Sequence, residues 1–325
     1  MQAMQKEQKA NTPFDVVVIG GLNVDFQVFG DKLPRTGETT TGSRLIVGSG
    51  GKGGNQAVAA ARLGANVAMV GMVGNDPRGI EVIADLRIEG INTDHVGVTG
   101  MASTGVAVIM TNLDAEKQIM VADGANGFCS VREVIAAEEF IKRASCLVLQ
   151  LELPLDAVSA AAEIGKRAGV RVILDAAPAR ALPDGFLDNI DIVRCNATEA
   201  QSHTGIVVTG CEHAIRAGRM LLERGPSVAI VQAGADGDVL VTRSETLALP
   251  RFDVQSVDRT GAGDAFVAAL AVRSAQGAPL SEAARYASAA AACATTVAGA
   301  RSGLPWSDRV EALLELSDAA PCGME

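Results

Sequence analysis

A segment with the sequence DRTGAGDAF, at residues 258–266, places small residues and a carboxylate directly before a helical stretch. Gly261, Ala262 and Gly263 would leave consecutive backbone N–H groups free at the helix start. Together with the helix dipole, these N–H groups can form an anion hole for a phosphate. Asp264 stands at the same helix start. It is either a helix cap or a base that accepts a hydroxyl proton while the anion hole stabilises a transferring phosphoryl group.

A second pair of polar residues begins another helical stretch. Asn196 and Glu199 have i, i+3 spacing, which puts an amide and a carboxylate on one face of a helix. There they could hold the water shell of a magnesium ion beside a nucleotide's phosphates. The same two residue types also form ordinary helix caps, so the pair by itself leaves both interpretations open.

Three further polar residues follow predicted strands. Asn23 and Asp25 come just after the first strand, and alternation in an extended segment places their side chains on one side, as the vicinal hydroxyls of a sugar require. A plain Asx turn is the alternative. Glu152 follows a later strand, at the carboxyl edge where open α/β sheets bind ligands.

The glycine-rich segment GSGGKGGNQ, at residues 48–56, runs straight into a helical stretch. Its glycines match G-x-G-x-x-G, and Asp76 follows at about the distance of a dinucleotide fingerprint. The segment does not follow the first strand, however, as a Rossmann opening would. Lys52 is followed by glycine, which excludes a Walker A loop. A nicotinamide dehydrogenase is therefore a minor alternative.

The framework that must position these residues alternates short apolar runs with amphipathic stretches. Strands are predicted at 16–19, 66–70, 146–151, 171–175, 191–194 and 227–231, and helices at 55–63, 81–89 and 157–167. Such alternation is typical of a parallel sheet buried on both faces. We therefore predict a doubly wound, mainly parallel α/β fold with helices on both faces.

Two stretches, about 26–47 and 96–121, interrupt this alternation with Thr, Val and Gly and with turn signals. We predict that they form antiparallel strands and meet as a small inserted sheet at the mouth of the main sheet. This sheet is either a lid over a site or an extension of the main sheet's edge. Residues 1–13 are polar and predict a flexible tail before one domain at 14–325.

The composition argues against several classes of protein. The formal charge of −10 and the aromatic content of 3% argue against nucleic-acid binding. Hydrophobic residues at 48%, with a mean hydropathy of +0.23, predict a folded chain. The longest uncharged run, Tyr286–Ala300, is too short to span a membrane, so we expect no membrane segment and a cytoplasmic location. The six cysteines lack a CxxC pair and predict free thiols.

Taken in order, these segments resemble the ribokinase-like (PfkB) carbohydrate kinases over nearly the whole chain. The matching segments are GGLNVDF, RTGETTTG, GGKGGNQAVAAARLGA, LQLE, APARALP, NATEA and DRTGAGDAF. GGKGGNQAVAA and APARALP are similar to the subgroup that phosphorylates the 5-hydroxyl of D-ribose. The resemblance therefore implies an ATP-dependent sugar kinase that uses magnesium and potassium. It also implies a homodimer formed through the β lid.

The resemblance further implies a role for each matching residue. Asp264 would be the base, and the amides of Gly261, Ala262 and Gly263 the anion hole. The sugar would be held by Asn23, Asp25, Gly51, Lys52, Asn55, Glu152 and Asp264. The nucleotide would lie along Asn196, Gln232, Gly234, Asp236, Gly237, Gly263 and Ser288, with magnesium near Asn196 and Glu199. Potassium would be held by carbonyl groups around Asp258, Thr260, Ala294, Val297 and Gly299.

A few positions depart from the family's pattern. Arg259 replaces Thr, Cys195 replaces Pro, Gly303 replaces Ser, and Asp-Ala-Ala-Pro at 175–178 replaces Asn-Pro-Ala-Pro. None of them touches Asp264 or the anion hole, so the expectation of a kinase stands while the sugar and the cation dependence stay open. Deoxyribose, a nucleoside, fructose or a keto-sugar acid is the alternative substrate. A non-catalytic sugar sensor with the same fold is the remaining alternative.

Overall fold

The predicted apolar runs form a nine-stranded sheet in the computed structural model, which describes residues 13–114, 116–234 and 237–319. The strand order is β13-β12-β11-β10-β9-β8-β1-β4-β5. The bounds are β1 Phe14–Ile19, β4 Val67–Gly74, β5 Asn92–Thr99, β8 Ala144–Leu149, β9 Arg171–Asp175, β10 Ile192–Cys195, β11 Val228–Gln232, β12 Asp238–Thr242 and β13 Thr246–Ala248. All neighbours from β11 to β5 in this order are parallel, whereas β12 and β13 are antiparallel. The sheet is therefore mainly parallel, as predicted.

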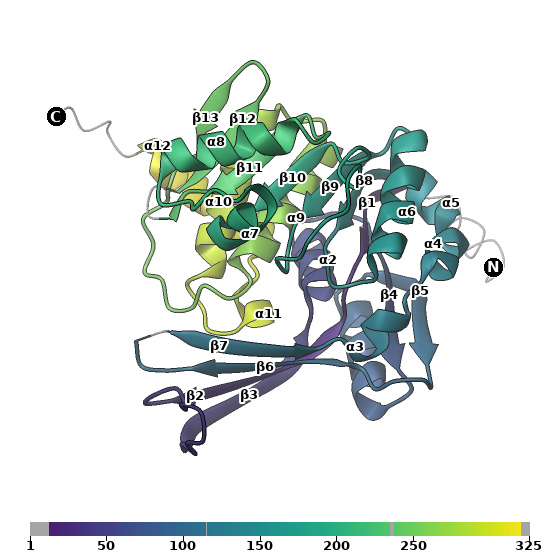
Figure 1. The fold of residues 1–325 in the computed structure, drawn as a ribbon, viewed down its shortest axis with the longest axis vertical. Helices are drawn as coiled ribbons and strands as arrows, with labels where there is room; N and C mark the ends of the chain where they lie inside the picture. The colour runs from purple at the N-terminus through teal and green to yellow at the C-terminus, as the bar shows by residue number, and fades with distance from the viewer. Residues whose placement is uncertain (1–12, 115, 235–236, 320–325) are drawn as a thin grey trace.

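Helices cover both faces of this sheet (Figure 1). Their bounds are α2 Lys52–Arg62, α3 Pro77–Ile88, α4 Val131–Ala136, α5 Glu138–Lys142, α6 Leu155–Arg167, α7 Ala197–Thr204, α8 Cys211–Leu222, α9 Ala262–Ala275, α10 Leu280–Ala294, α11 Ala300–Gly303 and α12 Ser307–Ala319, with a 3-10 helix, η1, at Gly124–Phe128. Strand β1 shows how the two layers arise. Val16 and Val18 pack into the core with α2, α9 and α10, whereas Val17 and Ile19 pack into the core with α6 and α8. Successive side chains of a strand point to opposite faces, so both faces are buried.

A separate four-stranded sheet, in the order β3-β2-β6-β7, lies at the bottom of Figure 1. Its strands are β2 Asn23–Gly30, β3 Gly42–Gly50, β6 Gly105–Thr111 and β7 Lys117–Ala122. The two predicted insertions thus meet in space as one small sheet, which we call the lid. Only its central pair, β2 and β6, is parallel; both outer pairs are antiparallel.

The lid's boundaries differ from the predicted ones at two places. Strand β2 begins at Asn23, so Asn23 and Asp25 belong to the lid itself. Residues 96–99 belong to β5, which pairs with β4 at the edge of the main sheet. Alternating polar and apolar residues suit any strand with one solvated face, so the pattern at 96–99 could not tell a lid strand from an edge strand.

Three expectations concern segments or residue types rather than the site. Residues 1–12 of the predicted tail at 1–13, together with Cys322, lie outside the described residues. Among the described residues, no helix is long and apolar enough to cross a bilayer. The cysteines in that part of the chain form no disulfide with one another.

Candidate active site

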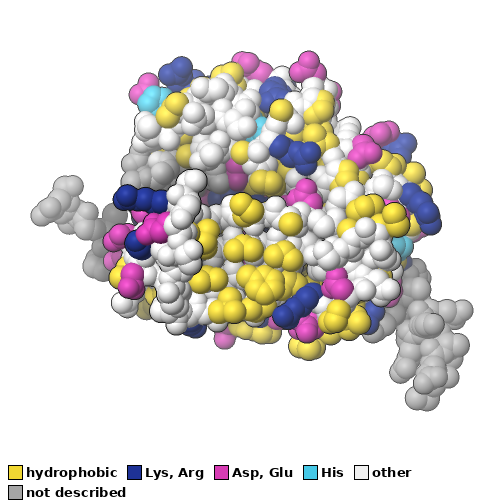
Figure 2. Space-filling view, turned by 60° about the horizontal axis from the view of Figure 1, so that its bottom comes forward, with side chains coloured by type: hydrophobic (Ala, Val, Ile, Leu, Met, Phe, Trp, Pro, Cys, Tyr) yellow, Lys and Arg dark blue, Asp and Glu magenta, His cyan; other side chains and the backbone are white. Residues whose placement is uncertain are grey.

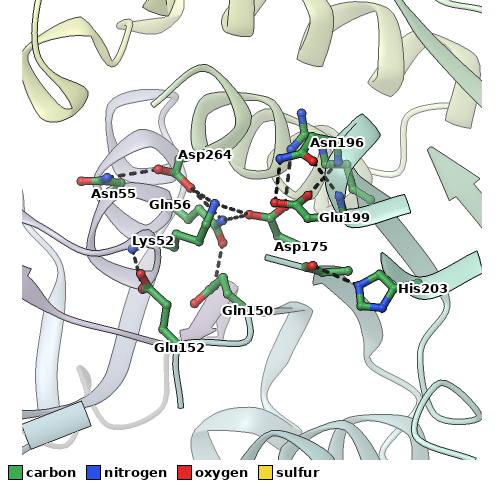
Figure 3. Close-up of polar contacts among 12 residues, drawn as sticks. Lys52, Asn55, Gln56, Gln150, Glu152, Asp175, Asn196, Glu199, His203 and Asp264 are labelled. Carbon is green, nitrogen blue, oxygen red and sulfur yellow. Dashed lines mark hydrogen bonds and ion pairs between the residues drawn. The ribbon is translucent and has the colours of Figure 1, made fainter. Parts of the chain in front are cut away.

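Six of the candidate residues gather at one edge of the main sheet (Figure 3): Lys52, Asn55, Glu152, Asn196, Glu199 and Asp264. Since parallel strands run in one direction, their carboxyl ends share an edge, and ligands bind there in open α/β sheets. Glu152 follows β8, Asp175 ends β9 and Asn196 follows β10. Helices α2 and α9 begin at the same edge and bring Lys52 and Asp264 to it.

Asp264 is buried in the first turn of α9. Asn55 Nδ2 donates a hydrogen bond to its Oδ2 at 3.1 Å, and Gln56 Nε2 donates to its Oδ1 at 3.1 Å. Lys52 Nζ lies 3.8 Å from Oδ1. Burial raises the pKa of Asp264 above its usual value, while Lys52 opposes this shift. These hydrogen bonds reach across to α2 rather than to the start of α9, which favours a positioned base over a helix cap.

The backbone before α9 has the shape that an anion hole needs. Gly261 has a φ of 83°, and a Cβ at this position would lie 2.7 Å from the carbonyl oxygen of Ala300. Only glycine fits this turn. The guanidinium of Arg194 approaches the same place, because a Cβ at Gly263 would lie 2.9 Å from Arg194 Nη1. A helix start with a buried guanidinium beside it can bind a phosphate.

Several carboxylates surround the ammonium group of Lys52. Its Nζ lies 3.2 Å from Asp175 Oδ2, and its backbone N–H donates to Glu152 Oε2 at 2.8 Å. Burial would lower the pKa of Lys52, but Asp175, Asp264, Glu199 and Glu152 outweigh burial and raise it. Lys52 therefore stays charged at neutral pH and holds these carboxylates together.

Sequence reasoning missed the amides and the arginine that complete this network. Gln56 Nε2 donates to Asp175 Oδ2 at 3.0 Å as well as to Asp264, and Gln150 Nε2 donates to Gln56 Oε1 at 2.6 Å. Arg194 Nη1 lies 3.5 Å from Asp175 Oδ1. The sequence signal that could have revealed Arg194 was the presence of a charged residue in the otherwise apolar strand IVRC. The ion pair also explains why this chain has a carboxylate at position 175.

Asn196 and Glu199 form a reciprocal cap at the start of α7. Glu199 N–H donates to Asn196 Oδ1 at 2.9 Å, while the backbone and side-chain N–H groups of Asn196 both donate to the Glu199 carboxylate at 2.7 Å. The cap interpretation is confirmed. No group of three or more His, Cys, Asp or Glu in the described residues could hold a metal by itself. Magnesium commonly binds one or two carboxylates together with substrate phosphates, so Glu199 fits a magnesium ion that a nucleotide helps to hold.

The residues assigned to a sugar lie around the base of the lid. Asn126 Nδ2 donates to Asn23 Oδ1 at 2.7 Å, which orients the Asn23 amide. Asp25 Oδ1 is buried without a hydrogen-bond partner among the described residues. Burial raises the pKa of Asp25 to about 6 and that of Glu152 to about 7. Gly51 has a φ of 80°, and a Cβ there would lie 2.6 Å from the carbonyl oxygen of Gly21. The unpartnered carboxylate oxygen suits a ligand hydroxyl.

The residues assigned to potassium lie together between the start of α9 and the end of α10: Asp258, Thr260, Ala294, Val297 and Gly299. Gly299 N–H donates to Asp258 Oδ2 at 2.9 Å. A Cβ at Gly303 would lie 2.4 Å from the carbonyl oxygen of Ala294 and 3.2 Å from that of Val297. Two backbone carbonyls thus converge beside Gly303, and converging carbonyls suit a potassium ion.

The residues assigned to the nucleotide are less closely grouped. Gln232 ends β11, and Gly234 and Gly237 have positive φ values of 68° and 93°. Ser288 is buried in α10, where its hydroxyl donates to the carbonyl oxygen of Ala284 at 3.1 Å. Asp236 lies outside the described residues. The roles of these residues along a nucleotide therefore stay predictions.

Two of the departures from the family's pattern adjoin site residues in the chain. Arg259 is exposed, whereas Cys195 is buried in β10. Burial raises the pKa of the Cys195 thiol, so it stays protonated at neutral pH. Neither side chain disturbs the hydrogen bonds of Asp264.

The parallel sheet, the glycine-shaped helix start and the positioned carboxylate together define a phosphotransferase of the α/β class. The family model for "pfkB family carbohydrate kinase" matches residues 14–307. The chain therefore belongs to the pfkB family of carbohydrate kinases.

Similar proteins cover almost the full length of the chain. It is 37% identical to a ribokinase of Haemophilus influenzae over 290 residues, which are 89% of this chain and 95% of that protein. It is 36% identical to a deoxyribokinase of Salmonella typhimurium over 305 residues, which are 94% of this chain and 100% of that protein. Its fold matches the structure of Arabidopsis thaliana ribokinase complexed with ribose and ATP, with a TM-score of 0.84, 32% identity, and coverage of 94% of this chain and 99% of that one.

Proposed function

We propose that this carbohydrate kinase transfers the γ-phosphoryl group of MgATP to the 5-hydroxyl of D-ribose and so produces ribose 5-phosphate. The observation that carries the proposal is Asp264, held by three α2 side chains beside a glycine-shaped anion hole. The similarity to ribokinases, one of them complexed with ribose and ATP, supports ribose as the sugar.

The chemistry needs a base, an anion hole and an enclosed site. Asp264 takes the proton of the 5-hydroxyl late in a loose transition state. The N–H groups of Gly261, Ala262 and Gly263, with Arg194 beside them, stabilise the charge on the transferring phosphoryl group. Glu199 would hold a magnesium ion together with the nucleotide's phosphates, and that ion would neutralise phosphate charge. Asn23, Asp25, Gly51, Asn55 and Glu152 hold the sugar under the lid, which excludes water.

Two further assignments belong to the same proposal. The nucleotide extends along the loop after β11 and towards Ser288 on α10. The backbone carbonyls near Gly303 would hold a potassium ion, which would steady the loop before α9. Their support is the family resemblance together with the positive φ angles of Gly234 and Gly237 and the carbonyls of Ala294 and Val297.

The function is tested by measuring ADP release from MgATP with D-ribose, deoxyribose, fructose and nucleosides, each with and without potassium. Turnover that is fastest with ribose and stimulated by potassium supports the whole proposal. A preference for deoxyribose would instead align the chain with its deoxyribokinase relative, which is the second candidate. Absence of turnover with every sugar would favour a non-catalytic sugar sensor.

Sugar binding should weaken as the pH falls. Burial raises the pKa of Asp25 to about 6 and that of Glu152 to about 7, so these groups take up protons as the solution becomes acidic. A protonated carboxyl accepts sugar hydroxyls less well, and sugar binding therefore favours the ionised form. We expect the Kd for ribose to rise by up to about tenfold per pH unit below the pKa of each group.

Titration calorimetry between about pH 5.5 and 8 checks this expectation. Asp25→Asn should remove the part of the pH dependence centred near pH 6. A Kd that is independent of pH in the unaltered protein would contradict the assignment of both carboxylates to the sugar.

We further propose that the lid forms a homodimer. The strand pairing places Leu45, Val47, Val108 and Met120 on one face of the lid, opposite the face that carries Asp25. Leu45 is 59% exposed and Met120 is 77% exposed. Figure 2, which brings the bottom of Figure 1 forward, shows hydrophobic side chains gathered on this side of the molecule. An apolar patch of this kind commonly marks a protein interface.

Val108→Asp should convert the dimer into monomers, since burying an unpaired charge in an interface costs several kcal/mol. We expect its dimer Kd to rise at least about 100-fold, measured by light scattering after size-exclusion chromatography. Leu316→Asp is the matched control, because Leu316 is 70% exposed on α12 and lies outside the lid. A dimer that survives Val108→Asp, or an unaltered protein that is monomeric, would refute the lid interface.

A further inference from the structure

One lysine of the lid reaches across to the segment that precedes the anion hole. Lys117 begins β7, and its Nζ lies 2.6 Å from Asp258 Oδ1. The same ammonium group also donates to the hydroxyl of Thr260. Lys117 and Asp258 are 141 residues apart in sequence, and 22% and 6% of their side chains are exposed. The ion pair is thus largely buried, which separates it from the ordinary surface pairs of the chain.

The strand register explains why Lys117 faces this segment. Lys117 pairs with Thr111, and Thr111 pairs with Phe29, so all three positions lie on one face of the lid. Gln27 shares that face, and its Nε2 lies 3.4 Å from Asp258 Oδ2. Two lid strands, β2 and β7, therefore contact the carboxylate of Asp258. They do so from the face opposite the exposed apolar side chains of the lid.

The carboxylate of Asp258 has a fixed place on the other side. Gly299 N–H donates to its Oδ2 at 2.9 Å, and Thr260 N–H donates to its Oδ1 at 3.0 Å. These two N–H groups and the ammonium group of Lys117 together fix the carboxylate of Asp258 in place.

The position of Thr260 links this cluster to the chemistry. Thr260 directly precedes Gly261, and the positive φ of Gly261 shapes the start of α9. Asp264 lies in the first turn of this helix. A lid that holds Asp258 and Thr260 through one ammonium group also holds the backbone leading into the anion hole. Any displacement of the lid away from the main sheet would have to break this ion pair.

We infer that Lys117 is a positioning residue that couples closure of the lid over the sugar to formation of the anion hole for the nucleotide. Sugar bound under the lid favours the closed lid, and the closed lid places Lys117 against Asp258. The ordered segment then binds the phosphates more tightly. Because such coupling is reciprocal, nucleotide should also tighten sugar binding. The inference rests on the proposed function only for the identity of the two ligands.

The test measures this coupling by binding alone. The Kd of a non-hydrolysable ATP analogue with magnesium is determined by calorimetry with and without D-ribose. In the unaltered protein we expect ribose to lower the Kd of the analogue by about fivefold or more. In Lys117→Met the ratio of the analogue's Kd without ribose to its Kd with ribose should fall close to one. The analogue's Kd without sugar should change little. Lys117→Arg keeps the charge and should retain part of the coupling.

Lys32→Met is the matched control within the lid. Lys32 pairs with Glu38, and 66% of its side chain is exposed, so its loss should leave the ratio unchanged. Unchanged coupling in Lys117→Met, or no coupling in the unaltered protein, would overturn the inference. Failure of the proposed function has a different signature, because it appears as absent turnover or as a preference for another sugar in the unaltered enzyme.

Discussion

Asp264→Asn should lower kcat by about 10²–10⁴-fold, the usual loss when a positioned base is removed. The carboxylate is held by Asn55, Gln56 and Lys52, and it lies directly beside the anion hole. Asparagine has nearly the same shape but cannot take the proton of the sugar hydroxyl. It keeps an amide oxygen that can accept one of the two hydrogen bonds. Sugar should therefore bind with little change while turnover almost stops.

ADP release measures turnover of this variant, and calorimetry measures its sugar binding. Asp308→Asn is a suitable control, because Asp308 is exposed at the start of α12. A kcat within tenfold of the unaltered enzyme would show that Asp264 is not the base. Loss of both sugar binding and thermal stability would instead point to a structural role for this carboxylate.

Lys52→Met should be the most damaging single change to stability at the site. Lys52 is the shared cation of Asp175 and Asp264, and breaking a buried pair typically costs about 3–5 kcal/mol. Since 28% of the Lys52 side chain is exposed, we expect the lower end, about 3 kcal/mol. Turnover should also fall, because Asp264 would hold its proton more tightly without the ammonium group.

Urea unfolding at several pH values tests the origin of this loss. Removing Lys52 should raise the pKa values of Asp264 and Glu152 further, so the folded variant binds more protons at low pH. The stability deficit should therefore be largest near neutral pH and shrink towards about pH 5. Lys166→Met removes a partner from the exposed Lys166–Asp191 pair and should cost no more than about 1 kcal/mol. Equal losses in the two variants would contradict the buried network around Lys52.

Local patterns predicted much of the fold. The alternation of apolar runs and amphipathic stretches identified strands such as β9, whose observed bounds agree with the prediction. It also showed that two insertions form a small sheet. The edge strand β5 was harder to assign, because one solvated face produces the same alternation in a lid and at a sheet edge.

The sequence by itself determined the residues that act through their immediate neighbours. Gly261 and Asp264 belong to one short segment, so the helix start and its carboxylate follow from residue order alone. The cap formed by Asn196 and Glu199 is local in the same way. Such features depend on backbone geometry over a few residues, which the spacing of residue types records directly.

Only the tertiary structure decided which distant side chains meet. Lys117 joins Asp258 across 141 residues, and Asn126 joins Asn23 across 103 residues. Arg194 meets Asp175 because β9 and β10 lie side by side in the sheet. These contacts follow from strand register and from the packing of separate elements, and neither is recorded in local spacing.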